Sequence, residues 1–96
     1  MNNYDSQAAL LSYRQTIDNL DAALIYILAE RFRCTHNVGE LKAAYNLPES
    51  DKNREAVQLT RLKEIAQSSG LDVNFVEGLM RYIIDEVIRR HEKLKA

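Results

Sequence analysis

Residues 10–45 read LLSYRQTIDNLDAALIYILAERFRCTHNVGELKAAY, and this stretch decides the fold. Its apolar side chains recur at alternating spacings of three and four residues, the heptad pattern of a helix that packs along one seam. No proline interrupts the stretch, and its only glycine is Gly39. We therefore predict one uninterrupted helix from Leu10 to Tyr45, which the turn and proline at 46–48 bring to an end. The seam consists of Leu10, Tyr13, Ile17, Leu20, Leu24, Ile27, Cys34, Val38 and Leu41.

This helix is too long for a compact monomer. At a rise of about 1.5 Å per residue it spans roughly 54 Å. A compact chain of 96 residues has a radius of gyration of only about 12 to 13 Å. We therefore expect the seam to close against a second copy of the chain, which makes the protein a homodimer.

Composition limits the possible partners. The 96 residues, 46% of them hydrophobic, suffice for one small domain spanning residues 1–96. The 13 Lys and Arg residues balance 14 Asp and Glu, so no global field favours nucleic acid or an anionic membrane. We find no signal peptide and no apolar run long enough to cross a bilayer, so we expect a cytoplasmic protein. The single cysteine, Cys34, excludes an intramolecular disulfide and a cysteine-based metal cage.

Two shorter helices follow, which makes the predicted class all-α with a long, a short and a medium helix. The second runs roughly from Lys52 to Gln67, with Ser50 or Asp51 as its cap. Its narrow apolar face consists of Val57, Leu62, Ile65 and Ala66.

The third helix runs from about Val73 to Leu94, and Asp72 is its predicted cap. This helix has a wide apolar face, as expected of an element that covers others. The face consists of Phe75, Val76, Leu79, Met80, Ile83, Ile84, Val87 and Ile88.

Arg31 interrupts the seam of the long helix where the pattern calls for a hydrophobic residue. No carboxylate lies three or four residues away from it, and the same is true of Lys42, eleven residues further on. Helix geometry places both cations on nearly the same face, about 16 Å apart along the axis. A partner helix could supply a carboxylate that fixes the register. Two unpaired cations on one face favour instead a ligand that carries carboxylates.

Arg14 lies seventeen residues before Arg31, roughly 25 Å away along the helix, which is too far for both to contact one small ligand. In an antiparallel pair of helices, Arg14 of one chain could approach Arg31 and Lys42 of the other. The alternative is a surface ion pair with Asp18, four residues on. The residues themselves leave these two possibilities equal.

Two further groups are candidates for chemistry. Asp51, Arg54 and Glu55 share one face of the second helix, and their spacing alone favours a capping and ion-pair cluster. Val87 and His91 continue the apolar face of the third helix, where a histidine is more often a half-solvated helix-end residue than a catalytic group. No ligands cluster at metal spacing, so we expect no metal site.

Five sequence motifs, taken in order and spacing, carry a resemblance to a known family. They are Leu11-Ser12-Tyr13-Arg14 leading to Ile17-Asp18 and Leu20-Asp21, then Leu28-Ala29-Glu30-Arg31, Val38-Gly39-Glu40-Leu41-Lys42, Asp51-Lys52-Asn53-Arg54-Glu55, and Leu71-Asp72. Together they resemble the all-helical class of chorismate mutases, intertwined dimers of three-helix chains that convert chorismate to prephenate. The resemblance extends from Leu11 to about Leu94.

The resemblance implies a role for each cation. Arg14 is expected to reach into the pocket of the other chain. Arg31 and Lys42 are expected to bind the substrate carboxylates, and Lys42 also to face the ether oxygen. The implied reaction is a unimolecular Claisen rearrangement, which needs no nucleophile, metal or cofactor and belongs to the shikimate pathway of aromatic amino acid biosynthesis.

The resemblance also assigns the remaining candidates. Asp51 and Glu55 are expected beside the ring hydroxyl, with Arg54 next to them. His91 stands where the family has a glutamine, or in some members a glutamate, that hydrogen-bonds the ether oxygen. Val87 replaces a residue that is serine in some relatives.

Three alternatives remain open. Two belong to the same fold: an isochorismate pyruvate lyase and an aminodeoxychorismate mutase. The cluster Asp51-x-x-Arg54-Glu55 favours the chorismate mutase over the lyase. The third is a non-enzymatic helical dimer in which Arg31 only sets the register.

Overall fold

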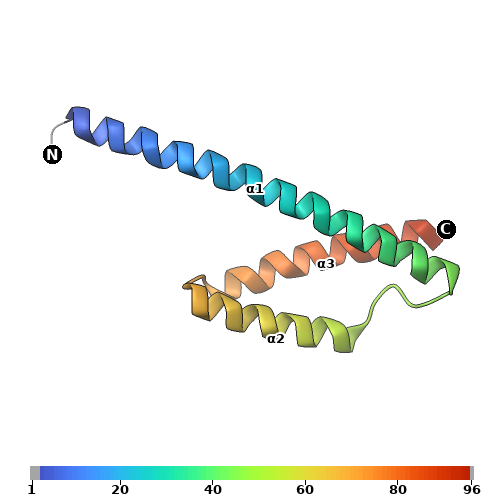
Figure 1. The fold of residues 1–96 in the computed structure, drawn as a ribbon. Coiled ribbons are helices and arrows are strands. Elements are labelled where there is room, and N and C mark those ends of the chain that lie inside the picture. The colour runs from blue at the N-terminus through green and yellow to red at the C-terminus, as the bar shows by residue number, and fades with distance from the viewer. Residues whose placement is uncertain (1–2, 96) are drawn as a thin grey trace. The chain divides into compact units, whose positions relative to one another are not determined.

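The computed structural model describes residues 3–95, and their side chains from Asp5 onward. The fold is all-α, with three helices, α1 (Asn3–Ala44), α2 (Lys52–Ser69) and α3 (Val73–Lys95), as Figure 1 shows. This confirms the predicted class and the order of the helices. Helix α1 begins at Asn3 rather than at Leu10, because the polar residues before Leu10 include no proline or glycine to stop it. None of the three described helices combines the length and the apolar character of a membrane span.

Specific capping interactions set the helix boundaries. The side chain of Asp51 accepts a hydrogen bond from the backbone N–H of Arg54 at 3.0 Å, so Asp51 rather than Ser50 caps α2. Asp72 caps α3 in the same way, accepting from the backbone N–H of Phe75 at 2.9 Å. Helix α2 ends at Ser69 and is capped by Gly70, whose φ of 78° is the left-handed conformation that glycine adopts without strain.

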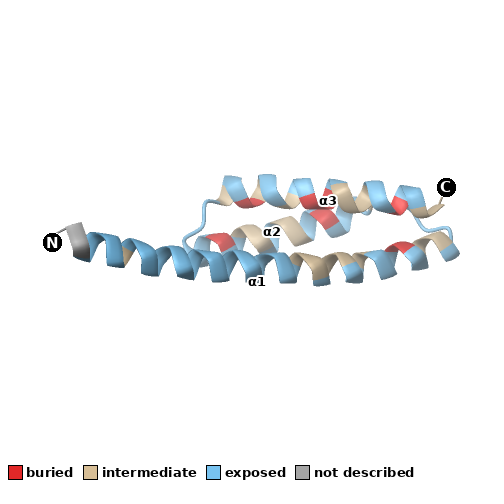
Figure 2. Cartoon of the chain, turned by 90° about the horizontal axis from the view of Figure 1, so that it is seen from above, coloured by how far each residue is buried: buried red, intermediate tan, exposed pale blue. Residues whose placement is uncertain are grey.

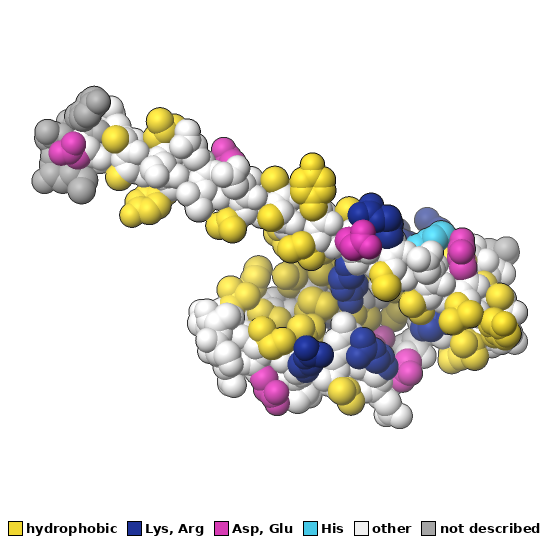
Figure 3. All heavy atoms as spheres, viewed as in Figure 1, with side chains coloured by type: hydrophobic (Ala, Val, Ile, Leu, Met, Phe, Trp, Pro, Cys, Tyr) yellow, Lys and Arg dark blue, Asp and Glu magenta, His cyan; other side chains and the backbone are white. Residues whose placement is uncertain are grey.

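The chain forms two compact units, and the first, which ends at Arg33, contains only the larger part of α1. Its apolar seam is exposed along its length; Ile27, for example, exposes 64% of its surface. Figure 3 shows these hydrophobic side chains along the helix. A single helix has nothing in its own unit to cover such a seam, so this unit has no core of its own.

The second unit begins at Cys34 and contains the end of α1 together with α2 and α3. Helices α2 and α3 lie side by side and run in opposite directions (Figure 1), and an ion pair of 3.0 Å between Lys63 and Glu77 links them. Figure 2 marks the buried residues in red. The buried apolar residues are Ala66, Val76, Ile83 and Ile84.

The predicted apolar faces of α2 and α3 are only partly correct. Val57 and Ile65 of α2 are exposed, whereas Glu55 and Ala66 are buried. On α3, Phe75 and Leu79 are exposed. The packed face of α2 is therefore rotated away from Val57, and it includes a carboxylate that an apolar pattern alone does not reveal.

Candidate active site

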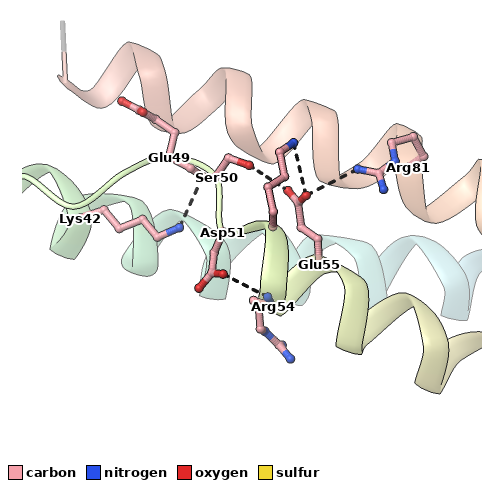
Figure 4. A network of polar contacts seen from close by, with 8 residues as sticks. Lys42, Glu49, Ser50, Asp51, Arg54, Glu55 and Arg81 are labelled. Atoms are coloured by element: carbon pink, nitrogen blue, oxygen red, sulfur yellow. Dashed lines mark hydrogen bonds and ion pairs between the residues drawn. The ribbon is translucent and has the colours of Figure 1, made fainter.

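Lys42 occupies the last turn of α1 and is half-buried. Its Nζ donates a hydrogen bond of 3.4 Å to the backbone carbonyl of Glu49 in the loop that follows (Figure 4). Lys42 also lines an open hollow of about 400 Å³ with loop residues and the start of α2. The other lining residues are Leu47, Pro48, Ser50, Asp51, Lys52 and Asn53. The structure thus brings Lys42 and Asp51, two of the predicted site residues, to one hollow.

The Asp51, Arg54 and Glu55 cluster divides into separate roles. Asp51 uses one carboxylate oxygen to cap α2, as its spacing to Arg54 predicted. The guanidinium of Arg54 is exposed and extends away from Glu55 (Figure 4). Glu55 forms its ion pairs instead with Lys52 of the same helix and with Arg81 of α3.

Glu55 is buried, with 8% of its surface exposed, and is held by three polar neighbours. Its Oε1 accepts a hydrogen bond of 3.3 Å from the hydroxyl of Ser50. Its Oε2 lies 3.6 Å from Nζ of Lys52 and 3.8 Å from Nη1 of Arg81 on α3 (Figure 4). We call Glu55, Ser50, Lys52 and Arg81 the Glu55 cluster. Sequence reasoning missed Arg81, because no spacing within one helix marks a contact between α2 and α3.

His91 is buried, with 3% of its surface exposed, so the alternative of a half-solvated ring is wrong. Its Nε2 lies 2.8 Å from the backbone carbonyl of Thr35. Because a carbonyl only accepts, Nε2 must carry the proton of this hydrogen bond. The other ring nitrogen, Nδ1, is buried and has no hydrogen-bond partner within the described part of the chain. Nε2 is thus fixed by its hydrogen bond to Thr35, whereas Nδ1 has no partner among the described residues.

Gly39 makes room for this histidine. A Cβ atom at position 39 would lie 2.5 Å from Cδ2 of His91 and 2.8 Å from Cδ1 of Leu94, much closer than van der Waals contact allows. The absence of a side chain at Gly39 therefore lets the end of α3 pack directly on the last turns of α1. Val87, one turn before His91, is half-buried.

Arg31 and Arg14 belong to the first unit. Arg31 is half-buried, and its Nη1 is buried without a hydrogen-bond partner among residues 5–95. This agrees with the prediction that its own helix supplies no carboxylate. Arg14 is exposed, and across the same residues no ion pair joins it to Asp18, so the alternative surface pair is not formed.

The loop between α1 and α2 is held by a residue that the sequence did not point to. Nζ of Lys95, at the end of α3, donates to the carbonyl of Leu47 and lies 3.3 Å from Oε1 of Glu49. A hydrogen bond from the backbone N–H of Glu49 itself, and then one from Lys95, lower the pKa of the Glu49 carboxyl below its ordinary value. Within residues 3–95, no three of the side-chain types that bind metals come together.

Comparison with known proteins identifies the family. A model of the family described as chorismate mutase type II matches residues 13–92. The bifunctional chorismate mutase/prephenate dehydratase of Buchnera aphidicola subsp. Schizaphis graminum is 33% identical over 93% of this chain and 23% of its own length. The corresponding protein of Escherichia coli K12 is 32% identical over the same shares. The T-protein of Enterobacter agglomerans is 34% identical over 82% of this chain and 21% of its own length.

This chain therefore spans about a quarter of the length of these relatives. The matched residues include Arg14, Arg31, Lys42 and His91, and they agree with the extent of the resemblance in the sequence. The chain belongs to the chorismate mutase type II family.

Proposed function

We propose that this chain is a chorismate mutase, which rearranges chorismate to prephenate. The observation that carries the proposal is the hollow lined by both Lys42 and Asp51 in a chain of this family. The ether oxygen and the hydroxyl of chorismate are on adjacent ring carbons. A cation that stabilises the ether oxygen and an oxygen that accepts from the hydroxyl are therefore expected side by side. Lys42 and Asp51 meet this expectation, because both line the hollow.

The reaction suits these side chains. The carbon–oxygen ether bond breaks while a new carbon–carbon bond forms within the same molecule, so no group leaves and no external atom is added. The protein has to hold a dianion in its reactive conformation and to stabilise negative charge as it grows on the ether oxygen. Fixed cations beside that oxygen perform both tasks.

Each cation has a proposed role. Arg31 and Lys42 bind the two carboxylates, and Lys42 also stabilises the ether oxygen. The buried Nη1 of Arg31, which lacks a partner among the described residues, supports this role because a buried donor is normally paired, here by a substrate carboxylate. Asp51 and Glu55 accept from the ring hydroxyl, with Arg54 beside them.

His91 donates to the ether oxygen in this proposal, and Val87 lies next to it in the pocket wall. Because Nε2 already donates to Thr35, the nitrogen available to the substrate is Nδ1. In a neutral ring protonated at Nε2, Nδ1 can only accept. A hydrogen bond from Nδ1 to the ether oxygen therefore requires the imidazolium form.

The active assembly is proposed to be an intertwined homodimer in which Arg14 of one chain completes the pocket of the other. The exposed seam of α1 supports this assembly, because packing it against a second copy removes its apolar surface from water. Two of the relatives, from Buchnera aphidicola and Escherichia coli, are bifunctional chorismate mutase/prephenate dehydratases. We accordingly propose that prephenate made by this chain serves aromatic amino acid biosynthesis.

A direct assay tests the function. The purified chain is incubated separately with chorismate and with isochorismate, and the products are identified by proton NMR. We expect prephenate from chorismate. Pyruvate released from isochorismate in its place would make the chain a lyase of the same fold, and conversion of neither substrate would favour a non-enzymatic dimer.

A further inference from the structure

The Glu55 cluster contains two cations and one carboxylate, which is more positive charge than is required to balance the charge of Glu55. The single carboxylate of Glu55 lies within 4.0 Å of two cations, Lys52 at 3.6 Å and Arg81 at 3.8 Å. Ser50 already supplies a neutral hydrogen bond to the other carboxylate oxygen. At 3.8 Å the guanidinium of Arg81 is beyond hydrogen-bond length, so it acts on Glu55 through its charge.

The surroundings of the cluster do not restore a negative balance. Lys42 lines the hollow together with two residues of the cluster, Ser50 and Lys52. The negative charge of Asp51, which accepts from the backbone of α2, lies with the positive charge of Lys42 around the hollow, and Glu49 pairs with Lys95. Within the cluster two cations therefore lie beside one carboxylate, which leaves a net positive charge next to the hollow that Ser50 and Lys52 line.

This field treats two ring substituents differently. A hydroxyl is neutral and can donate to a lone pair that the carboxylate of Glu55 still has free. An amino group at the same place is a cation near neutral pH, and the charges of Lys52 and Arg81 repel it. A lone carboxylate, by contrast, would attract that cation.

From this geometry we propose that Arg81, assisted by Lys52, is a specificity-determining residue. By neutralising Glu55, the pair makes the site accept chorismate and reject the analogue that carries an amino group in place of the ring hydroxyl. The inference rests on the proposed function and adds to it the residue that separates a chorismate mutase from an aminodeoxychorismate mutase.

Exposure limits the size of the effect. Arg81 exposes 44% of its side chain and Lys52 exposes 81%, so solvent screens both charges and Lys52 contributes less. Removing the charge of Arg81 should shift the selectivity by roughly three- to tenfold, the range of a partly screened charge interaction. Removing the charge of Lys52 should shift it in the same direction and by less.

The experiment measures kcat/KM for chorismate and for 4-amino-4-deoxychorismate near neutral pH, with product identified for each. The variants are Arg81→Gln, Arg81→Lys and Lys52→Gln, and circular dichroism verifies that each is folded. Arg89→Gln is the matched control, because Arg89 lies on the same helix and pairs with Glu86, away from Glu55. Selectivity is the ratio of the two kcat/KM values.

We expect Arg81→Gln to lower the preference for chorismate, Arg81→Lys to retain most of it, and Arg89→Gln to leave it unchanged. The shift should disappear when the pH is raised far enough to neutralise the amino group of the analogue. A ratio that is the same in Arg81→Gln as in the wild type, with turnover of chorismate intact, overturns the specificity role alone. If Arg81→Gln does not fold, an unchanged ratio in Lys52→Gln overturns it. A wild-type chain that converts neither substrate refutes the proposed function, and this inference with it.

Discussion

A histidine whose one ring nitrogen donates to a backbone carbonyl has a single nitrogen left for a ligand. In His91 that nitrogen is Nδ1, and the proton on Nε2 is committed to Thr35. Glutamine, the residue that the family resemblance places here, donates through its amide at any pH. Glutamine can therefore donate a hydrogen bond at any pH, whereas His91 can donate through Nδ1 only in its imidazolium form.

This difference predicts a pH profile. Catalytic efficiency of the wild type should fall as the pH is raised, because neutral His91 cannot donate through Nδ1. His91→Gln should flatten the profile and keep substantial activity. His91→Ala should lose about tenfold or more in kcat/KM at low pH, as expected for a lost donor to a developing charge. The measurement is kcat/KM between about pH 5 and 9.

Full efficiency of His91→Ala across that range would show that the ring only packs against α1. Thermal unfolding of each variant is the accompanying control, since the ring is buried and its loss also lowers stability.

The cations of α1 give a second prediction at this scale. Arg31→Ala and Lys42→Ala should each lower kcat by about 10²- to 10³-fold, because each removes a preorganised charge from the transition state. The matched control is Arg33→Ala on the same helix, an exposed residue that pairs with Glu30. Circular dichroism should show the same helix content in all three. Turnover in Arg31→Ala or Lys42→Ala equal to that of Arg33→Ala would remove the cation concerned from the mechanism.

At the scale of elements, the end of α3 fixes the loop that follows α1. Lys95 holds the carbonyl of Leu47 and the carboxylate of Glu49, and the backbone carbonyl of Glu49 in turn accepts from Lys42. A residue at the far end of the chain thus positions the partner of a proposed catalytic cation. We expect Lys95 to act as a positioning residue and not to touch substrate.

Lys95→Gln tests this arrangement. The pKa of Glu49 is held below its ordinary value first by the backbone N–H of Glu49 and then by Lys95, so the variant should raise that pKa only part of the way back. KM for chorismate should rise a few-fold with a smaller change in kcat. The measurements are an NMR titration of the Glu49 carboxyl and steady-state kinetics, with Lys93→Gln on the same last turn as the control.

The contact between Lys95 and Glu49 also affects how the stability of the fold changes with pH. Because folding lowers the pKa of Glu49, its contribution to stability is present above the ordinary carboxyl pKa and is lost as the pH falls through the lowered value. Lys95→Gln should therefore lose less stability on acidification than the wild type. An unchanged Glu49 titration in Lys95→Gln would show that the contact does not persist in solution.

What the sequence predicted about these elements has a physical pattern. The caps Asp51 and Asp72 follow from hydrogen bonds between residues three apart, and the sequence contains that information directly. The contacts of His91 with Thr35 and of Lys95 with Leu47 join residues 56 and 48 positions apart. No periodicity records such contacts, and for the same reason the burial of Glu55 on the packed face of α2 and its contact with Arg81 were not predicted.

At the scale of the whole molecule, the part of the α1 seam that lies in the first unit is exposed. Burying each Leu or Ile of the seam contributes about 1.5–3 kcal/mol, so several of them together favour association strongly. Size-exclusion chromatography with light scattering should give twice the mass of the chain at micromolar concentration. A folded, active monomer would contradict the proposed assembly and the shared pocket.

Mixing variants tests the shared pocket itself. Arg14→Ala should be inactive as a homodimer, because each pocket lacks the cation supplied by its partner. Mixed with Arg31→Ala chains under conditions that exchange subunits, it should regain part of the wild-type activity, since a mixed dimer keeps one pocket with every cation. Mass spectrometry of the intact mixture verifies the exchange. A mixture that exchanges and stays inactive would show that Arg14 acts within its own chain or not at all.

The close approach of His91 to Gly39 also couples the two positions in evolution and in engineering. Alanine at position 39 meets the ring of His91 at 2.5 Å, so Gly39→Ala alone should be strongly destabilising. In an His91→Ala background the ring is gone, and Leu94 is then the remaining close neighbour, at 2.8 Å from the new Cβ. The cost of the alanine should be smaller there, and a double-mutant cycle on unfolding free energies should give a favourable coupling. Substitutions at position 39 thus become more tolerable only after the histidine has been replaced, an epistasis that fixes the order in which this pair of residues can change.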